Sequence, residues 1–404
     1  MSQSEKSETP KPREMRLEHI DGLRALAALY VVVHHMVFYL NDDLPKGIMG
    51  HIGQLFMFGH YAVDIFIVLS GFCLMLPVIR NQSQLRGGAW LFFKKRARRI
   101  LPPYFSAVAL SLVLIFLCIG RSETIWQASL PVTWSAIVAH VLLVQDMFNG
   151  TVFKINYVLW SISVEWRIYF LFPALVWCWR RFGAPATAGV TAAISFLLIL
   201  PLSHTPLNMS DSGLSVHYIG LFSFGMLAAG MAYGHEGTLL RLRGSLPWGF
   251  IAAVLFGGAL AMNKGYFHHW YGPWQIQDLL VGLAAMSLLI ALTPRENSDA
   301  LGWLRAGLGC KPLAWVGMFS YSLYLVHPPV IELLWTYLLR PLHLDAARAL
   351  AVFSTVGLGA VVAFAYGFFL VCERPFMTSK KRAQTGSTEA IIAAGSVVQP
   401  AAEA

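Results

Sequence analysis

The first long apolar segment contains an arginine and a histidine whose side chains and spacing suit substrate binding or catalysis. Arg24 and His35 are eleven residues apart. At about 100° per residue, an α-helix returns them to within about 20° of one face, about 16 Å apart along the axis. The pair could therefore hold the two ends of one long substrate. His34 points about 100° away from His35, so we expect it to pack against a neighbouring segment rather than to share the role of His35.

A second polar cluster occupies residues 59–72, inside an otherwise apolar segment. Asp64 could orient a catalytic imidazole, as carboxylates often do for a catalytic histidine. Alternatively, it could form a salt bridge with a nearby basic residue. Gly71 lies seven residues later on the same face, where the missing side chain allows another helix to approach closely. Ser70 has no activating partner nearby in the sequence, so we expect it to pack between helices.

A third cluster places polar side chains along one side of a predicted helix. Ser161, Glu165 and Tyr169 recur every four residues and form a polar stripe. Glu165 could act as an acid or base, bind a sugar hydroxyl, or form an ion pair with an arginine such as Arg167. Trp160 comes directly before the stripe, and we take Trp160 and Ser161 as candidate substrate-binding residues.

The fourth cluster surrounds a pair of prolines. Ser320, Tyr324 and His327 share one helix face, and His327 directly precedes Pro328 and Pro329. Proline lacks a backbone N–H, so the pair is expected to kink the helix and to leave carbonyls without their usual donors. A hydrogen bond from His327 to such a carbonyl is the favoured interpretation, with catalysis as the alternative. Tyr324 and His327 are further candidates for substrate binding.

A strongly basic segment runs over residues 80–99, with seven lysines or arginines and no acid. Aromatic residues beside the basic residues at 94–99 predict a helix that lies at the cytoplasmic membrane interface, and a membrane span is expected to start at Pro102 and Pro103. The basic residues either set the orientation of the chain or bind an anionic ligand, and both roles can hold together.

The composition predicts an all-α, polytopic membrane protein. The chain has 404 residues, of which 56% are hydrophobic and 13% charged, against roughly 25% charged in ordinary soluble domains. Residues 134–148 are apolar but too short to span a bilayer, and we expect a re-entrant or interfacial helix there. We predict about ten spans: 17–40, 54–79, 102–120, 158–179, 186–202, 214–233, 247–263, 275–293, 313–338 and 346–371.

The distribution of positive charge predicts the orientation. Most of the 30 lysines and arginines fall on the side that holds both termini, which the positive-inside rule makes cytoplasmic. The net charge of +9 therefore gives no reason to expect nucleic acid as a partner. Residues 1–16 and 377–404 are expected to be disordered cytoplasmic tails around a transmembrane domain at 17–376. No phosphate-binding loop or cysteine–histidine metal spacing occurs, so no metal site is expected.

Ionised groups at bilayer depth indicate a functional interior. Each costs roughly 2.5–3.5 kcal/mol on insertion scales and usually faces an internal cavity. Arg24, His35, Asp64, Glu165 and His327 all fall within predicted spans. Such groups, paired inside a helix bundle, usually line a path or a site.

Taken in order, these clusters resemble the acyltransferase family 3 of integral-membrane acyltransferases, which includes bacterial O-acetylases of cell-surface polysaccharides and macrolides. The resemblance covers about residues 17–376. It is carried by Arg24 and His35, by Val63–Phe72, Lys95–Pro102, Leu159–Glu165 and Ser320–Pro328, and by Cys372-Glu373-Arg374-Pro375.

The resemblance implies transfer of an acyl group, usually acetyl, from acyl-coenzyme A to a hydroxyl of a glycan, a lipid-linked saccharide or a small-molecule acceptor. It implies His35 as the catalytic residue, with Arg24, Arg96 and Arg99 engaging the phosphates of the coenzyme. His35 would act as a general base or carry an acyl-histidine intermediate. Asp64 and Glu165 are further catalytic candidates. The short C-terminal tail leads us to expect a single-module enzyme. The resemblance implies a bacterial cytoplasmic (inner) membrane as its location.

Two other classes of protein remain compatible with these residues. A multi-span transporter or flippase of a glycan or small solute would also bury ionisable groups in a helix bundle. An acyl-CoA-binding sensor would have the same basic residues without turnover. Release of coenzyme A distinguishes the enzyme from both.

Overall fold

The computed structural model describes residues 17–40, 47–120, 123–203, 205, 215–263, 274–294 and 299–377. Within these ranges all regular elements are helical. The tails were predicted at 1–16 and 377–404, and apart from Met377 they lie outside the described residues. The α-helices are α1 (Glu18–Phe38), α2 (Ile48–Gln54), α3 (Gly59–Ile79), α4 (Gly88–Leu117), α5 (Trp134–Val141), α6 (Trp160–Phe182), α7 (Ala184–Leu197), α8 (Ile199–Ser203), α9 (His217–Tyr233), α10 (Gly237–Ser245), α11 (Trp248–Asn263), α12 (Trp274–Ala291), α13 (Gly302–Leu308), α14 (Lys311–Met318), α15 (Ser320–Leu334), α16 (Ala346–Val352) and α17 (Leu358–Phe368).

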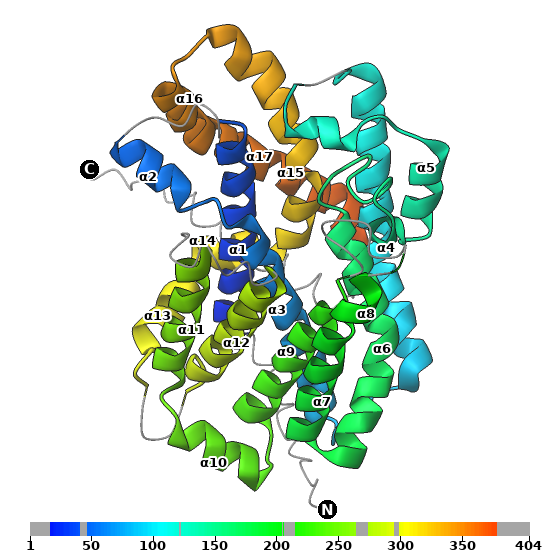
Figure 1. Cartoon of the computed structure of the whole chain (residues 1–404), viewed down its shortest axis with the longest axis vertical. Coiled ribbons are helices and arrows are strands. Elements are labelled where there is room, and N and C mark those ends of the chain that lie inside the picture. The colour runs from blue at the N-terminus through cyan, green and yellow to red at the C-terminus, as the bar shows by residue number, and fades with distance from the viewer. Residues whose placement is uncertain are drawn as a thin grey trace, which may run out of the picture.

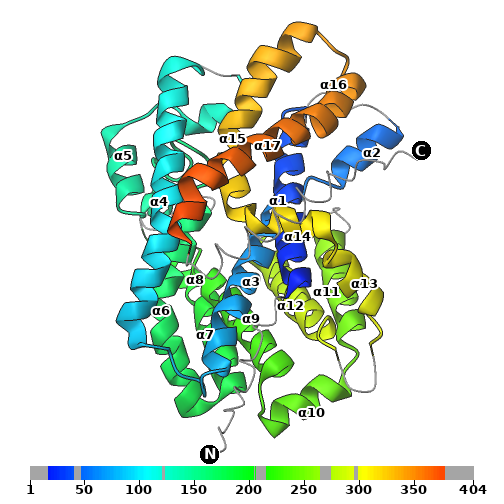
Figure 2. The same ribbon diagram turned by 180° about the vertical axis from the view of Figure 1, so that it is seen from behind.

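The helices form an elongated bundle around α1 and α3 (Figure 1). α3 packs along α9 and α12, and α1 packs against α3, α14 and α15. α4 and α6 form one long side of the molecule, and α11 and α13 form the other, as the reverse view also shows (Figure 2). This arrangement brings the polar clusters of α1, α3, α6 and α15 into the middle of the bundle.

Two glycines allow α3 and α9 to touch. A Cβ atom added at Gly71 of α3 would stand 2.0 Å from the carbonyl oxygen of Phe222, and one added at Gly225 of α9 would stand 1.9 Å from that of Val68. No real side chain tolerates such separations, so both positions require glycine. The close helix approach predicted at Gly71 is confirmed.

Several helices can cross a bilayer by length and composition. Among the described residues, six pass this test, and a seventh is obtained if α10 and α11, bent by 70°, are taken as one broken span. Three predicted spans fail for physical reasons. α6 carries Glu165, Arg167, Arg180 and Arg181, and α9 has only 17 residues. α15 continues directly as a π-helix at Trp335–Leu339, and it carries the polar residues His327 and Glu332. The chain is therefore a multi-pass, all-α membrane protein, and the prediction of ten spans remains a prediction.

The basic segment does not form a separate interfacial helix. α4 runs without interruption from Gly88 to Leu117 and contains Pro102 and Pro103 in its interior. The expected helix boundary at this proline pair was therefore wrong. A proline removes one backbone donor, but the flanking turns keep the helical path. The basic residues and the following apolar segment thus belong to one rigid element.

The predicted ninth span is divided, but not where the prolines stand. α14 ends at Met318, Phe319 interrupts the helix with φ −118° and ψ 20°, and α15 then continues through Pro328 and Pro329. The helix thus breaks about nine residues before the proline pair, and the kink expected at the pair stays a prediction. The short helix expected within 134–148 is present as the eight-residue α5.

Candidate active site

A cavity of about 490 Å³ lies between α1, α3, α4, α6 and α15. Its lining extends from Leu17 at the start of α1, and Arg80 at the end of α3, to Ser161 and Tyr324 deeper in the bundle. This volume is within the range of ligand-binding pockets. We call it the central cavity. The polar stripe predicted on α6 faces it, because Ser161, Glu165 and Tyr169 all belong to the lining.

The central cavity gathers the predicted phosphate-binding residues. Arg24 comes from α1 and Arg96 and Arg99 from α4, yet all three line the same space, together with Arg80. None of the ion pairs formed among the described residues involves any of the four. Positive groups without a carboxylate partner can bind an anionic ligand. Arg80 was not predicted individually, although it opens the basic segment.

Glu165 lies at the centre of a hydrogen-bonded group in the cavity wall. It accepts hydrogen bonds from the hydroxyl of Ser70, at 2.6 Å, and from the hydroxyl of Tyr169. Ser70 therefore does more than pack between helices. Its link to Glu165, 95 residues away, has no signal in the sequence. Both acceptor bonds hold the carboxylate on the cavity side of α6.

The ion pair suggested between Glu165 and Arg167 does not form. Arg167 instead binds Asp146 through both of its terminal nitrogens, with Nη1 2.6 Å from Oδ1. Asp146 is fully buried, so the arginine supplies the charge that the carboxylate needs there. Arg167 points away from the stripe because residues two apart on a helix do not share a face.

The two histidines of α1 and α15 meet although 292 residues separate them. Nδ1 of His35 lies 3.0 Å from Nε2 of His327, and Nδ1 of His327 lies 2.9 Å from the carbonyl oxygen of Tyr324. That carbonyl would normally accept from residue 328, which is a proline and has no N–H. The predicted hydrogen bond of His327 to a carbonyl freed by the proline pair is confirmed.

This chain of hydrogen bonds fixes the protons of both rings. A carbonyl only accepts, so Nδ1 of His327 carries a proton, and Nε2 of the neutral ring is an acceptor. Nδ1 of His35 must then donate to it. The Nε2 atom of His35 is left with a free lone pair, which is the form that a general base requires.

The second proline-freed carbonyl is satisfied from another segment. Nδ2 of Asn156 donates to the carbonyl oxygen of Leu325 at 3.0 Å and to the hydroxyl of Ser111 at 3.2 Å. Leu325 stands four residues before Pro329, so this amide replaces the missing backbone donor. Asn156 therefore lets α15 continue through its prolines, a role that no pattern in the sequence indicates.

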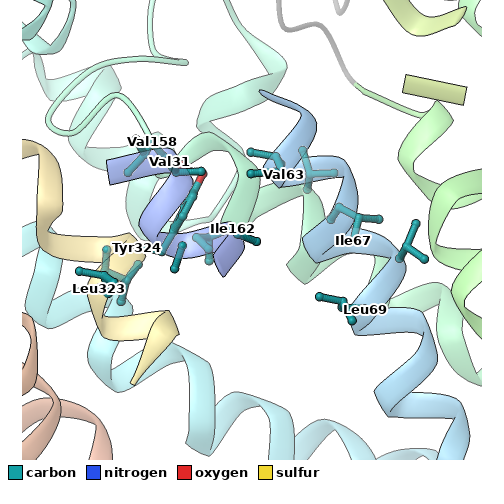
Figure 3. Close-up of a cluster of buried hydrophobic side chains, with 14 of the residues drawn as sticks. Val31, Val63, Ile67, Leu69, Val158, Ile162, Leu323 and Tyr324 are labelled. Atoms are coloured by element: carbon teal, nitrogen blue, oxygen red, sulfur yellow. Dashed lines mark hydrogen bonds between the residues drawn. The ribbon is translucent and has the colours of Figure 1, made fainter. Parts of the chain in front are cut away.

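Tyr324 connects the central cavity with the histidine pair. Its hydroxyl lies 2.7 Å from that of Ser161 and 3.1 Å from the carbonyl oxygen of Val158, and its ring centroid lies 5.8 Å from that of His327. Apolar residues of α1, α3 and α6 surround it (Figure 3). Neither His35 nor His327 lines the cavity, so the Tyr324–Ser161 contact marks its deep end.

Two residues predicted to belong to the site, Asp64 and Trp160, lie away from both the central cavity and the histidine pair. Asp64 does not reach His35. It is fully buried beside His60 of its own helix and Asp278 of α12. Trp160 stacks on Tyr218 of α9, with ring centroids 6.1 Å apart, and does not line the cavity. The spacing of His60 and Asp64, four residues apart on α3, was a usable signal for this grouping.

His34 packs as expected. Its Nδ1 lies 2.7 Å from the carbonyl oxygen of Phe56. A Cβ atom added at Gly59 would stand 2.2 Å from the His34 ring, which fills the space beside this glycine. The ring thus ties α1 to the start of α3, on a side of the helix that His35 does not share.

Comparison with known proteins finds named acyltransferases that are similar to this chain. The chain is 26% identical to the acyltransferase MdmB of Streptomyces mycarofaciens, over 80% of each protein. It is 26% identical to the peptidoglycan O-acetyltransferase OatA of Listeria monocytogenes, over 78% of this chain and 49% of that protein. The O-acetyltransferase OatA of Staphylococcus aureus is 24% identical over 80% of this chain and 51% of its own length. The chain thus spans about half the length of these last two relatives. No solved structure is a significant match.

The family comparison covers most of the chain. Residues 17–371 match the family model described as an acyltransferase domain, Acyl_transf_3. This range contains the four arginines, the histidine pair and the lining of the central cavity apart from Glu373 and Met377. The chain therefore belongs to acyltransferase family 3, and it is a multi-pass membrane acyltransferase whose transferred group is not an aminoacyl group.

Proposed function

We propose that this protein transfers an acetyl or related acyl group from acyl-coenzyme A to a hydroxyl of a glycan, a lipid-linked saccharide or a similar acceptor. One observation carries the proposal. A cavity lined by Arg24, Arg96 and Arg99 reaches inward to Tyr324, whose ring contacts the histidine pair. A long ligand with an anionic end and a reactive end fits this layout.

The arginines are the proposed binding site for the phosphates of the donor. Guanidinium groups make paired, charge-assisted hydrogen bonds to phosphate oxygens. The pantetheine arm would then follow the wall formed by α3 and the stripe of α6. Glu165 is held by Ser70 and Tyr169, and we assign it the role of positioning Arg24 and Arg96, which it attracts electrostatically.

The Tyr324–Ser161 contact must open for the thioester to reach His35. Ser161, Tyr324 and His327 would then line the reaction space and contact the acceptor. We no longer place Trp160 there, because it stacks against α9 rather than facing the cavity. The proposed separation of the donor site from the histidines thus depends on a single side-chain contact between α6 and α15.

In the proposed reaction, Nε2 of His35 accepts the proton of the acceptor hydroxyl as its oxygen attacks the thioester carbonyl. The new carbon–oxygen bond forms and the carbon–sulfur bond breaks. Coenzyme A leaves as a thiolate and takes the proton back from His35. His327 acts as a positioning residue that keeps the proton of His35 on Nδ1. An acyl group carried on Nε2 of His35 is the stepwise alternative.

The proposed orientation places the arginines at the cytoplasmic surface of a bacterial cytoplasmic membrane. Acyl-coenzyme A is made in the cytoplasm, and a basic cytoplasmic end agrees with the positive-inside rule. Both termini would be cytoplasmic in this arrangement. The names of the relatives support a hydroxylated cell-surface acceptor, because two of them are O-acetyltransferases and one of those is a peptidoglycan O-acetyltransferase.

The test is the release of free coenzyme A from acetyl-CoA by the purified protein in detergent or nanodiscs, with cell-envelope glycan extract as acceptor. We expect acceptor-dependent release by the wild type and a loss of about 10²–10⁴-fold in His35→Ala, the range for removing a general base. His51→Ala, at an exposed position on α2, is the matched control and should keep full activity. Equal release by wild type and His35→Ala would refute the assigned role of His35.

A further inference from the structure

A group of buried metal-ligating side chains lies outside the central cavity, where α3, α9 and α12 begin. His60 and Asp64 come from α3 and Asp278 from α12, and one ligand atom from each lies within 4.8 Å of the other two. His217, the first residue of α9, adds an imidazole, with Nε2 3.0 Å from Oδ2 of Asp278. The proposed acyl transfer uses none of these four residues.

The group holds two carboxylates at buried positions. Asp64 and Asp278 are both fully buried. Within the described part of the chain, neither oxygen of Asp64 has a hydrogen-bond partner, and the same is true of Oδ1 of Asp278 and Nε2 of His60. Buried carboxylates this close repel each other and need a positive charge between them. Of the two carboxylates, only Asp278 lies within ion-pair distance of an imidazole among the described residues. The Tyr218 hydroxyl beside Asp64 carries no positive charge.

We propose that His60, Asp64 and Asp278 bind a divalent cation, and that the ligand atoms of this site favour Zn²⁺. Imidazole nitrogen and carboxylate oxygen are the usual zinc ligands, whereas Mg²⁺ and Ca²⁺ favour oxygen alone. Nε2 of His60 lies 3.4 Å from Oδ1 of Asp278, close to the spacing of two ligands on one tetrahedral ion. An ion at the centre requires each ligand atom to move inward by less than about 1 Å to reach zinc bonds of about 2.0–2.2 Å.

The neighbouring residues suit this assignment. His217 binds the other oxygen of Asp278 and thereby orients Oδ1 toward the ion, the role that outer hydrogen bonds have around metal ligands. The side chain of His60 is 38% exposed, although its Nε2 atom is buried. The ring thus lies between solvent and the carboxylates, which gives the ion a route in. A bound cation would fasten α3 to α12 directly and to α9 through His217.

The experiment measures zinc in the full-length protein. Purified protein is stripped with a chelator, incubated with ZnCl₂ alone, freed of excess metal by gel filtration and analysed by mass spectrometry. We expect about one zinc per chain in the wild type, and at least tenfold weaker zinc binding by titration in His60→Ala and Asp64→Asn, in line with the loss of a ligand. MgCl₂ and CaCl₂ should not compete at equal concentration.

Matched controls separate metal loss from misfolding. His51→Ala makes the same change at an exposed position of α2 and should bind zinc as the wild type does. His60 is partly exposed, so its alanine variant should fold, which the gel-filtration profile checks. Zinc should raise the Tm of the wild type and of His51→Ala but not that of His60→Ala. No zinc uptake by folded wild-type protein, or equal uptake by His60→Ala, overturns the proposal and leaves a shared proton as the charge between the carboxylates.

Discussion

The hydrogen bond between His327 and His35 leads to a prediction that distinguishes the orientation of the His35 ring from the binding of acyl-coenzyme A. Replacing His327 with phenylalanine keeps an aromatic ring in the buried position but removes the acceptor for Nδ1–H of His35, 3.0 Å away. It also removes the donor to the carbonyl of Tyr324. The ring of His35 can then turn or place its proton on Nε2, and in that tautomer it no longer accepts a proton from the acceptor hydroxyl.

The size of the effect follows from these two contacts. A neutral hydrogen bond contributes about 0.5–1.5 kcal/mol, and a buried group left unsatisfied costs about 1–3 kcal/mol. We expect the variant to lose the contribution of the hydrogen bond, and part of the cost of the unsatisfied group, in the transition state. At 1.36 kcal/mol per tenfold, kcat then falls by about 10- to 100-fold. The KM for acyl-coenzyme A should change by less than about twofold, since the arginines remain in place.

The assay is steady-state release of coenzyme A, with donor binding measured separately by calorimetry. His327→Gln is the informative companion, because an amide oxygen can accept from Nδ1–H of His35. We expect it to recover at least part of the lost kcat. A phenylalanine variant with unchanged kcat, or a glutamine variant no better than phenylalanine despite normal donor binding, would contradict the assigned tautomer and the positioning role of His327.

Two further predictions concern the donor site and the helix contact. Arg96→Ala should raise the KM for acyl-coenzyme A by about 10- to 100-fold, since a charged hydrogen bond contributes about 1.5–3 kcal/mol. The kcat should stay nearly unchanged. A fall in kcat alone would argue against phosphate binding by Arg96. Gly71→Ala should lower the Tm by several degrees or prevent folding, because its Cβ would stand 2.0 Å from a backbone oxygen of α9. Gly257→Ala, where the new Cβ meets nothing within 4 Å, is the control and should leave the Tm unchanged or raised.

Features that depend on local spacing could be predicted from the sequence. The stripe of Ser161, Glu165 and Tyr169 faces the central cavity, as helix periodicity requires. His327 meets a carbonyl freed by the proline pair, because that consequence of proline is confined to four residues. Arg24, Arg96 and Arg99 line one cavity, although only the family resemblance suggested that they act together.

Features that depend on contacts between distant segments could not be predicted from the sequence. His35 and His327 are 292 residues apart, and His217 and Asp278 are 61 apart, so no helical period relates them. The partner of Arg167 is Asp146 in a connecting segment, which no spacing rule identifies. The continuity of α4 through its prolines was also missed, because the intrinsic helix-breaking tendency of proline gives way to the surrounding tertiary packing.

The uninterrupted course of α4 makes donor affinity sensitive to the lipid around the protein. The apolar part of α4 runs from Ile100 to Leu117 and is about 27 Å long, close to the hydrocarbon core of a bilayer of about 30 Å. A membrane thinner than this stretch favours tilting of the whole rod of 30 residues. Because Arg96 and Arg99 are fixed to this rod while Arg24 belongs to α1, tilting changes their separation. We therefore expect acyl chain length in reconstituted vesicles to alter the apparent affinity for the donor without any change in the protein.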